Sequence, residues 1–178
     1  MNPAKRAVLL GLVFLFFLAL SYIENVSFFN YIKEIFMNFP LAMTLVFIHN
    51  LLAISLIILG MAFYVEFVLA FLPEKKIERV VLRHPRVFAI VFTVVILFVS
   101  ILRASTLLQG QVAINTLALV MLFSLPNGIL EGYGIFRSIE KTLGRKLTLR
   151  DLAIVYSIFF FAAILEVGFV HILLWIST

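Results

Sequence analysis

Long apolar runs alternate along the chain with short segments that carry nearly all of its charge. A helix needs about 20 predominantly apolar residues to cross the hydrocarbon core of a bilayer. We therefore predict an all-α membrane protein, with one transmembrane domain over residues 1–178 and about five membrane-spanning helices. The predicted spans cover about residues 7–23, 41–72, 87–107, 112–136 and 152–176.

Two stretches of this pattern depart from a simple series of spans. As a single helix, Leu41–Leu72 would be about 48 Å long, which exceeds the thickness of the hydrocarbon core. We expect it to tilt, to kink near Gly60 or to project into water. The segment Glu24–Phe39 mixes polar and apolar positions at a spacing that predicts a short amphipathic helix lying in the membrane interface.

Composition supports lipid as the main solvent of the chain. Hydrophobic residues make up 64% of the sequence and charged residues 13%, against about 45–50% and about 25% in soluble domains. A soluble fold of this size could not bury so much apolar surface. No small-residue cleavage site follows the first run, so we expect a span there and not a signal peptide. The absence of cysteine excludes disulfides and thiolate metal ligands.

Basic residues occupy three segments that the five-span pattern puts on one side of the membrane. The opposite connections contain only Lys33, with Arg103 near the end of the third span. The positive-inside rule then predicts a cytoplasmic N-terminus and an extracytoplasmic C-terminus. The net charge of +5 follows from this asymmetry, so we expect no nucleic-acid partner. The three segments contain Lys5 and Arg6; Lys75, Lys76, Arg79, Arg83 and Arg86; and Arg137, Lys141, Arg145, Lys146 and Arg150.

Several polar residues fall at membrane depth, where each needs a partner or a purpose. Because so many of them occur, we expect most to point into the bundle. Two histidines without a third ligand do not predict a metal site, and Arg103 is expected to snorkel to the interface. By predicted depth, His49, Asn50, Arg103, Asn115 and His171 belong to the outer half, Asn127 and Glu166 to the middle, and Glu66 and Glu131 to the cytoplasmic side.

The fourth span contains the strongest local feature of the sequence. Pro126 and Gly128 together predict a kink or a break halfway along it. Asn127 and Glu131 are four residues apart and therefore share a helix face. Gly128 and Gly132 form a small-xxx-small pair that lets another helix approach closely.

This segment has two interpretations. It is either a packing kink, with Glu131 bonded to a neighbouring helix or to Arg137, or a mid-membrane cation or proton site of the kind found in discontinuous helices. Glu66 and Asn127 would assist Glu131 in the second case. Glu166 poses the same choice between one interhelical hydrogen bond and a proton relay. A carboxyl group at this depth is expected to be neutral unless a cation accompanies it.

Motifs for catalysis are missing from the sequence. It has no GxSxG, HExxH or Walker-type segment, and its one aspartate, Asp151, falls in a predicted loop. We therefore expect neither an enzyme nor a bound cofactor.

Two short motifs give the chain a family resemblance. It resembles the SpoIIM-like membrane proteins, named for stage II sporulation protein M, in its length and its roughly five spans. Phe47-Ile-His-Asn50 is similar to the entry of the family's second span, and Pro126-Asn-Gly-Ile-Leu-Glu131 to its Pro-His-Gly-x-x-Glu run. Asn127 stands where the family usually has histidine, which puts histidine-dependent chemistry in doubt. The resemblance implies a membrane anchor for a partner complex.

The function we expect first is that of a non-enzymatic scaffold or subunit of a membrane complex, as a homo-oligomer. The Gly128/Gly132 face, the amphipathic segment and the basic loops offer docking surfaces for membrane or cytoplasmic partners. The alternative is an ion- or proton-coupled transporter or channel. The polar residues that would form its site are Asn50, Glu66, Asn127, Glu131 and Glu166. An intramembrane enzyme is a third and weaker possibility.

Overall fold

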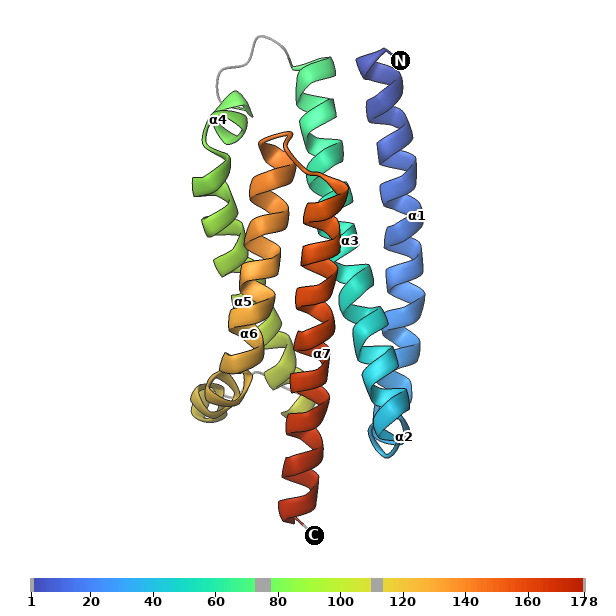
Figure 1. Cartoon of the computed structure of the whole chain (residues 1–178), viewed down its shortest axis with the longest axis vertical. Helices are drawn as coiled ribbons and strands as arrows, with labels where there is room; N and C mark the ends of the chain where they lie inside the picture. Colours follow the sequence, from blue (N-terminus) through green and yellow to red (C-terminus); the bar gives the residue numbers. More distant parts are fainter. Residues whose placement is uncertain (1, 73–77, 110–113, 178) are drawn as a thin grey trace.

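The computed structural model describes residues 2–72, 78–109 and 114–177, with side chains except at 3, 29, 32–33, 78–79, 103–124 and 173–177. These residues form seven α-helices (Figure 1). The helices are α1 Pro3–Asn30, α2 Ile32–Phe36, α3 Phe39–Phe71, α4 Glu78–Arg83, α5 Pro85–Gln109, α6 Ile114–Leu143 and α7 Leu149–Ser177.

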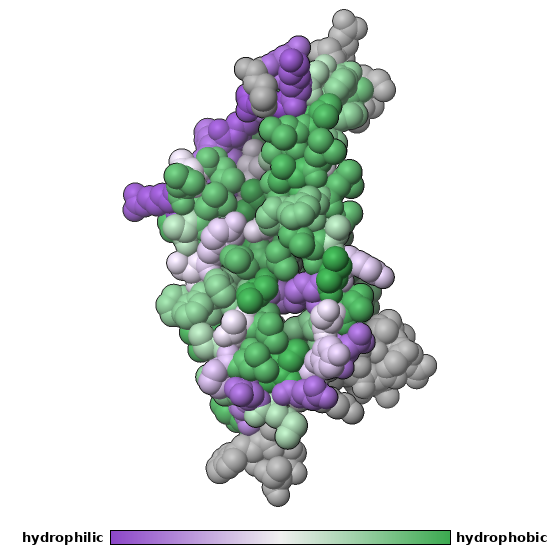
Figure 2. All heavy atoms as spheres, turned by 90° about the vertical axis from the view of Figure 1, so that its right-hand side faces the viewer, coloured by the Kyte–Doolittle hydropathy of each residue, from purple (hydrophilic) through white to green (hydrophobic). Residues whose placement is uncertain are grey.

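Four of the helices are long and apolar enough to cross a membrane: Ala4–Phe28, Phe39–Phe71, Pro85–Leu102 and Leu149–Ile172. In Figure 2 the surface is mostly hydrophobic over its middle, with hydrophilic residues gathered toward both ends. This distribution is compatible with a polytopic membrane protein. Helix α6 carries more charge, because Glu131, Arg137, Glu140 and Lys141 all lie in its described half.

Helix α3 is the centre of the bundle. It packs against α1 on one side and against α6 and α7 on the other, while α5 packs on α6. The N-terminus, α4 and the α6–α7 connection lie at one end of the bundle, which we call the basic end (Figure 1). Helix α2 and the C-terminus lie at the opposite end, the far end.

Helix boundaries differ from the sequence prediction in two places. The segment 24–39 is not one amphipathic helix, because α1 continues to Asn30 and a separate short helix, α2, follows. Ile35 of α2 is buried against Ala42 and Val46 of α3, so α2 packs on the bundle. The predicted charged loop after α3 contains α4.

Helix α3 is continuous through Gly60, where a kink was one of three expected outcomes. A Cβ at Gly60 would lie 3.1 Å from the ring of Phe14 in α1, and one at Gly11 of α1 would lie 3.0 Å from the ring of Phe63. The rings of Phe14 and Phe63 are themselves parallel, with centroids 6.4 Å apart. Gly60 therefore provides room for an aromatic ring from α1 and does not break the helix.

Two apolar clusters fill the bundle, one toward each end. The cluster near the basic end includes Ile54 and Ile58 of α3, Ile139 of α6 and Phe159 of α7. The cluster near the far end joins Ile35, Ala42 and Val46 to Ala163 and Val167 of α7. On α3 both clusters contribute to one buried row at four-residue spacing, formed by Ala42, Val46, Asn50, Ile54 and Ile58. Asn50 is the polar member of that row and separates the two clusters.

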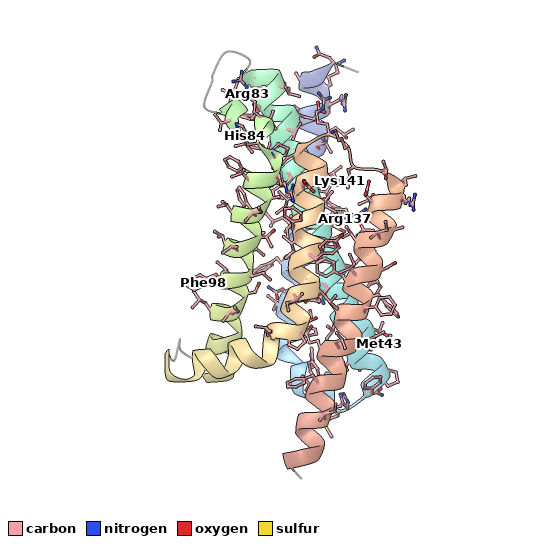
Figure 3. All side chains as sticks on the ribbon, turned by 60° about the vertical axis from the view of Figure 1, so that its left-hand side comes forward. Met43, Arg83, His84, Phe98, Arg137 and Lys141 are labelled. Atoms are coloured by element: carbon pink, nitrogen blue, oxygen red, sulfur yellow. The ribbon has the colours of Figure 1, made fainter. Side chains whose placement is uncertain are left out.

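Helix α6 changes direction along its length. Figure 3 shows its first part lying across the far end of the bundle before the helix turns to run along α5 and α7. Pro126 lies within this helix. On α5, Phe98 points away from the bundle (Figure 3), as expected for a side chain that faces lipid.

A tight contact between α6 and α7 yields a stability prediction. A Cβ at Gly134 would lie 2.8 Å from the ring of Phe159, which is 4% exposed and enclosed by the cluster near the basic end. We expect Gly134→Ala to cost about 1–3 kcal/mol of unfolding free energy through overpacking. Gly168→Ala on α7 is the control, because a Cβ there meets nothing within 4 Å. Denaturant unfolding of both variants in detergent measures the difference, and equal midpoints would contradict this packing.

Candidate functional site

Four polar side chains meet in the gap between the two apolar clusters. They are Asn50 of α3, Asn127 and Glu131 of α6, and Glu166 of α7, and we call them the polar layer. The sequence grouped all four as candidates for a polar core. The structure brings them into contact from three helices.

Asn127 bridges the two carboxylates of the layer. Its Nδ2 donates to Oε1 of Glu131 at 3.0 Å and to Oε2 of Glu166 at 3.4 Å. Both hydrogens of the amide are thereby used. Its Oδ1 is buried and has no hydrogen-bond partner among the described residues. One side chain thus joins α6 to α7 and leaves an acceptor unused.

Asn50 supplies the second amide. It is 9% exposed, and its Nδ2 lies 3.5 Å from the same Oε1 of Glu131. The Asn50 side chain also lies within hydrogen-bonding reach of Glu166. The sequence contained a signal for this role, because Asn50 interrupts an otherwise apolar row at helical spacing.

The layer contains more acceptors than donors. In the hydrogen bonds that join these four side chains, every donor is the amide nitrogen of Asn50 or Asn127 and every acceptor is a carboxylate oxygen. Glu131 and Glu166 share one nitrogen and act on each other electrostatically, so two ionised groups here would repel. A proton or a cation would remove this repulsion. The arrangement is suited chemically to holding one positive charge.

A second pair lies beside the layer on the side of the far end. Nδ1 of His49 is 2.9 Å from Oε2 of Glu24 in α1, and the side chains are 23% and 17% exposed. The Phe28 ring stacks on the imidazole with centroids 5.2 Å apart. Sequence reasoning assigned Glu24 to an interfacial helix and so missed this pair. The continuation of α1 past residue 23 was the information it lacked.

Glu66 is not brought to the layer. It pairs with Arg6 of α1 at 3.0 Å, while Arg145 of the α6–α7 connection approaches to 4.0 Å. Along α3 it lies about 24 Å from Asn50. The depth assigned from sequence was on the correct side of the layer, but the interhelical partner could not be read from it. Glu66 ties α1 and α3 together at the basic end.

The residues of the predicted helix break have separate surroundings. Pro126 is exposed, and a Cβ at Gly128 would meet nothing within 4 Å. A Cβ at Gly132 would lie 3.0 Å from Leu97 of α5, so of these two glycines it is Gly132 that packs closely against a described side chain. Arg137 does not pair with Glu131. It binds Asp151 at 2.9 Å and the Tyr133 hydroxyl at 3.2 Å.

His49 and His171 have hydrogen-bond partners outside the layer. Nδ1 of His171 donates to the Val167 carbonyl at 3.0 Å, while His49 binds Glu24. Within the described part of the chain, no group of three or more His, Asp or Glu side chains could hold a metal ion. The side chains of Arg103, Asn115 and Ser124 lie outside the described residues.

Comparison with protein-family models, with curated proteins and with solved structures found no match to this chain.

The bridging amide yields a stability prediction. Asn127→Leu leaves Glu131 and Glu166 without their shared donor, and we expect a loss of about 1–3 kcal/mol because buried acceptors go unpaired. Adding Glu131→Leu removes one of these acceptors and should restore part of the loss. Unfolding free energies of the single and double variants in detergent test this coupling. A double variant that is less stable than Asn127→Leu would contradict it.

Proposed function

We propose that this chain is a multi-pass membrane protein that carries protons or metal cations across the bilayer, with the polar layer as its binding site. The observation that carries the proposal is the Asn127 amide shared by two carboxylates from different helices. Carboxylates at membrane depth are costly and typically mark ion or proton pathways. A packing role alone would be met by one carboxyl and one amide.

In this proposal α1, α3, α5, α6 and α7 are the five spans, and the basic end faces the cytoplasm. Arg6, Arg83 and Lys141 support the orientation, because they lie at the same end of the bundle from three separate segments (Figure 3). The C-terminus and the far end are then extracytoplasmic.

The turn of α6 belongs to the same proposal. We attribute it to Pro126, which removes a backbone donor and clashes with the preceding turn. Helix α6 continues through Pro126, and the proline leaves one carbonyl of the preceding turn without its helical donor. The first residue of the polar layer on this helix, Asn127, follows directly. Discontinuous helices hold ions at mid-membrane in several transporter folds.

The SpoIIM-like resemblance remains a proposal that the polar layer supports. Its two motifs are far apart in sequence, and their last residues, Asn50 and Glu131, are in contact at 3.5 Å. If the resemblance reflects common descent, the contact between the motifs gives a physical reason for keeping both.

The test is ion flux into liposomes that contain the purified protein. Glu131→Gln removes the ionisable group but keeps its size and shape, so we expect proton or alkali-cation flux to be lost while the unfolding midpoint stays near that of the wild type. Glu66→Gln is the matched control, because Glu66 is a glutamate of α3 that pairs with Arg6 outside the layer. It should keep its flux and lose at most about 1 kcal/mol of stability.

Two results would contradict the proposal. One is equal flux through the wild type and Glu131→Gln. The other is a folded wild type that moves neither protons, sodium nor potassium above the rate of empty liposomes.

A scaffold function is the second candidate, and one observation favours it. Gly128 has open space beside it and lies between the exposed side chains of Leu125 and Ile129. A helix from another copy would fit closely there. Gly128→Leu should then weaken self-association in detergent, as measured by sedimentation. Under the transport proposal alone it should leave the oligomeric state unchanged.

A further inference from the structure

The pair formed by Glu24 and His49 lies where an ion would approach the polar layer from the far end. Both side chains are partly exposed, at 23% for His49 and 17% for Glu24. His49 directly precedes Asn50 on α3, and a protonated His49 would attract the carboxylate of Glu166. Glu24 from α1 and Glu166 from α7 are two titratable groups that face His49.

The acidic groups form a stepped series along the bundle. Each position is measured along its helix from the helix end at the basic end. Glu24 lies about 32 Å along α1 from Pro3, and Glu166 lies about 26 Å along α7 from Leu149. Glu131 lies about 18 Å along α6 from Leu143. His49 contacts the first of these groups and acts on the second, and Asn127 links the second to the third. The series leads from the far end to the middle of the bundle.

We propose that the ion bound by the polar layer is a proton, and that Glu24 and His49 pass it to Glu166 from the far end. This inference rests on the proposed transport function and names its ion and its entrance.

The donor set favours a proton over a metal cation. Oε1 of Glu131 already faces two amide nitrogens, and both hydrogens of Asn127 point at carboxylate oxygens. A metal ion would have to displace these N–H groups and would need several oxygen ligands at once. A proton needs one lone pair, and a carboxyl oxygen of Glu166 or Glu131 provides it.

Histidine is suited to this step because it changes protonation near neutral pH and has two ring nitrogens. Nδ1 of His49 is oriented by Glu24, and the ring face is held by Phe28. The imidazole takes up a proton from water while Glu24 balances its charge. It then releases one proton to a Glu166 oxygen, so that one N–H bond breaks and one O–H bond forms. No redox partner is required.

The experiment measures proton uptake in proteoliposomes with a pH-sensitive dye, over a range of external pH. We expect His49→Gln to lower proton flux about tenfold or more, in line with the loss of a positioned acid–base group. Glu24→Gln should lower it in the same direction. His171→Gln is the matched control, because His171 lies toward the same end but binds the Val167 carbonyl, and it should keep wild-type flux.

A relay is separated from a structural role by chemical rescue. His49→Ala leaves space for a small base, so added imidazole should restore part of the proton flux of this variant and none in Glu131→Gln. The wild-type proton flux should fall as the external pH rises, because a relay through an imidazole requires the ring to take up a proton. His49→Gln should lose this dependence.

The outcomes separate this inference from the proposed function. In one outcome, Glu131→Gln abolishes flux while the His49 and Glu24 variants match the wild type in rate and pH profile. That result would contradict the relay through Glu24 and His49 and would support the polar layer as the binding site. If the wild type carries sodium or potassium and no protons, the result contradicts the proton as the transported ion and supports the proposed transport function. If no flux is found at all, both fail.

Discussion

The need of enclosed carboxylates for hydrogen-bond donors constrains this bundle more than any other interaction. Glu131 and Glu166 extend from α6 and α7 into the region between the two apolar clusters. Their partners are the amides of Asn127 and Asn50. Because a polar group without a partner is costly away from water, the positions of α3, α6 and α7 are tied to one another at this level.

The rest of the bundle is arranged around that layer. Apolar clusters lie on both sides of it, and α1 is attached to α3 by the reciprocal packing of Gly11 on Phe63 and of Gly60 on Phe14. At the basic end, the carboxylate of Glu66 is paired with arginine side chains that reach solvent and not with amides. The protein thus separates a solvated ionic end from an acidic layer in which two carboxylates are held by the amides of Asn127 and Asn50.

Much of the fold could be read from the sequence. The apolar runs predicted helices near all of their observed positions, because helix formation and lipid exposure depend on local composition. The helix ends were predicted less accurately, since α1 continues past Glu24 and α6 continues past Phe136. A charged residue was taken as the end of a helix in both cases, although Glu24 and Arg137 find partners in His49 and Asp151.

The sequence by itself determined which polar residues interrupt the apolar helices, since these are read directly from the order of residues along the chain. The four-residue spacing also put Asn127 and Glu131 on one helix face, where Nδ2 of Asn127 and Oε1 of Glu131 are 3.0 Å apart. Only the tertiary structure decided that Asn50 and Glu166 join them, that Glu66 turns to Arg6, and that Glu24 meets His49. The physical reason is that these contacts depend on the rotation and pairing of whole helices. Those are set by packing between segments far apart in the chain, such as the fit of glycine against phenylalanine between α1 and α3.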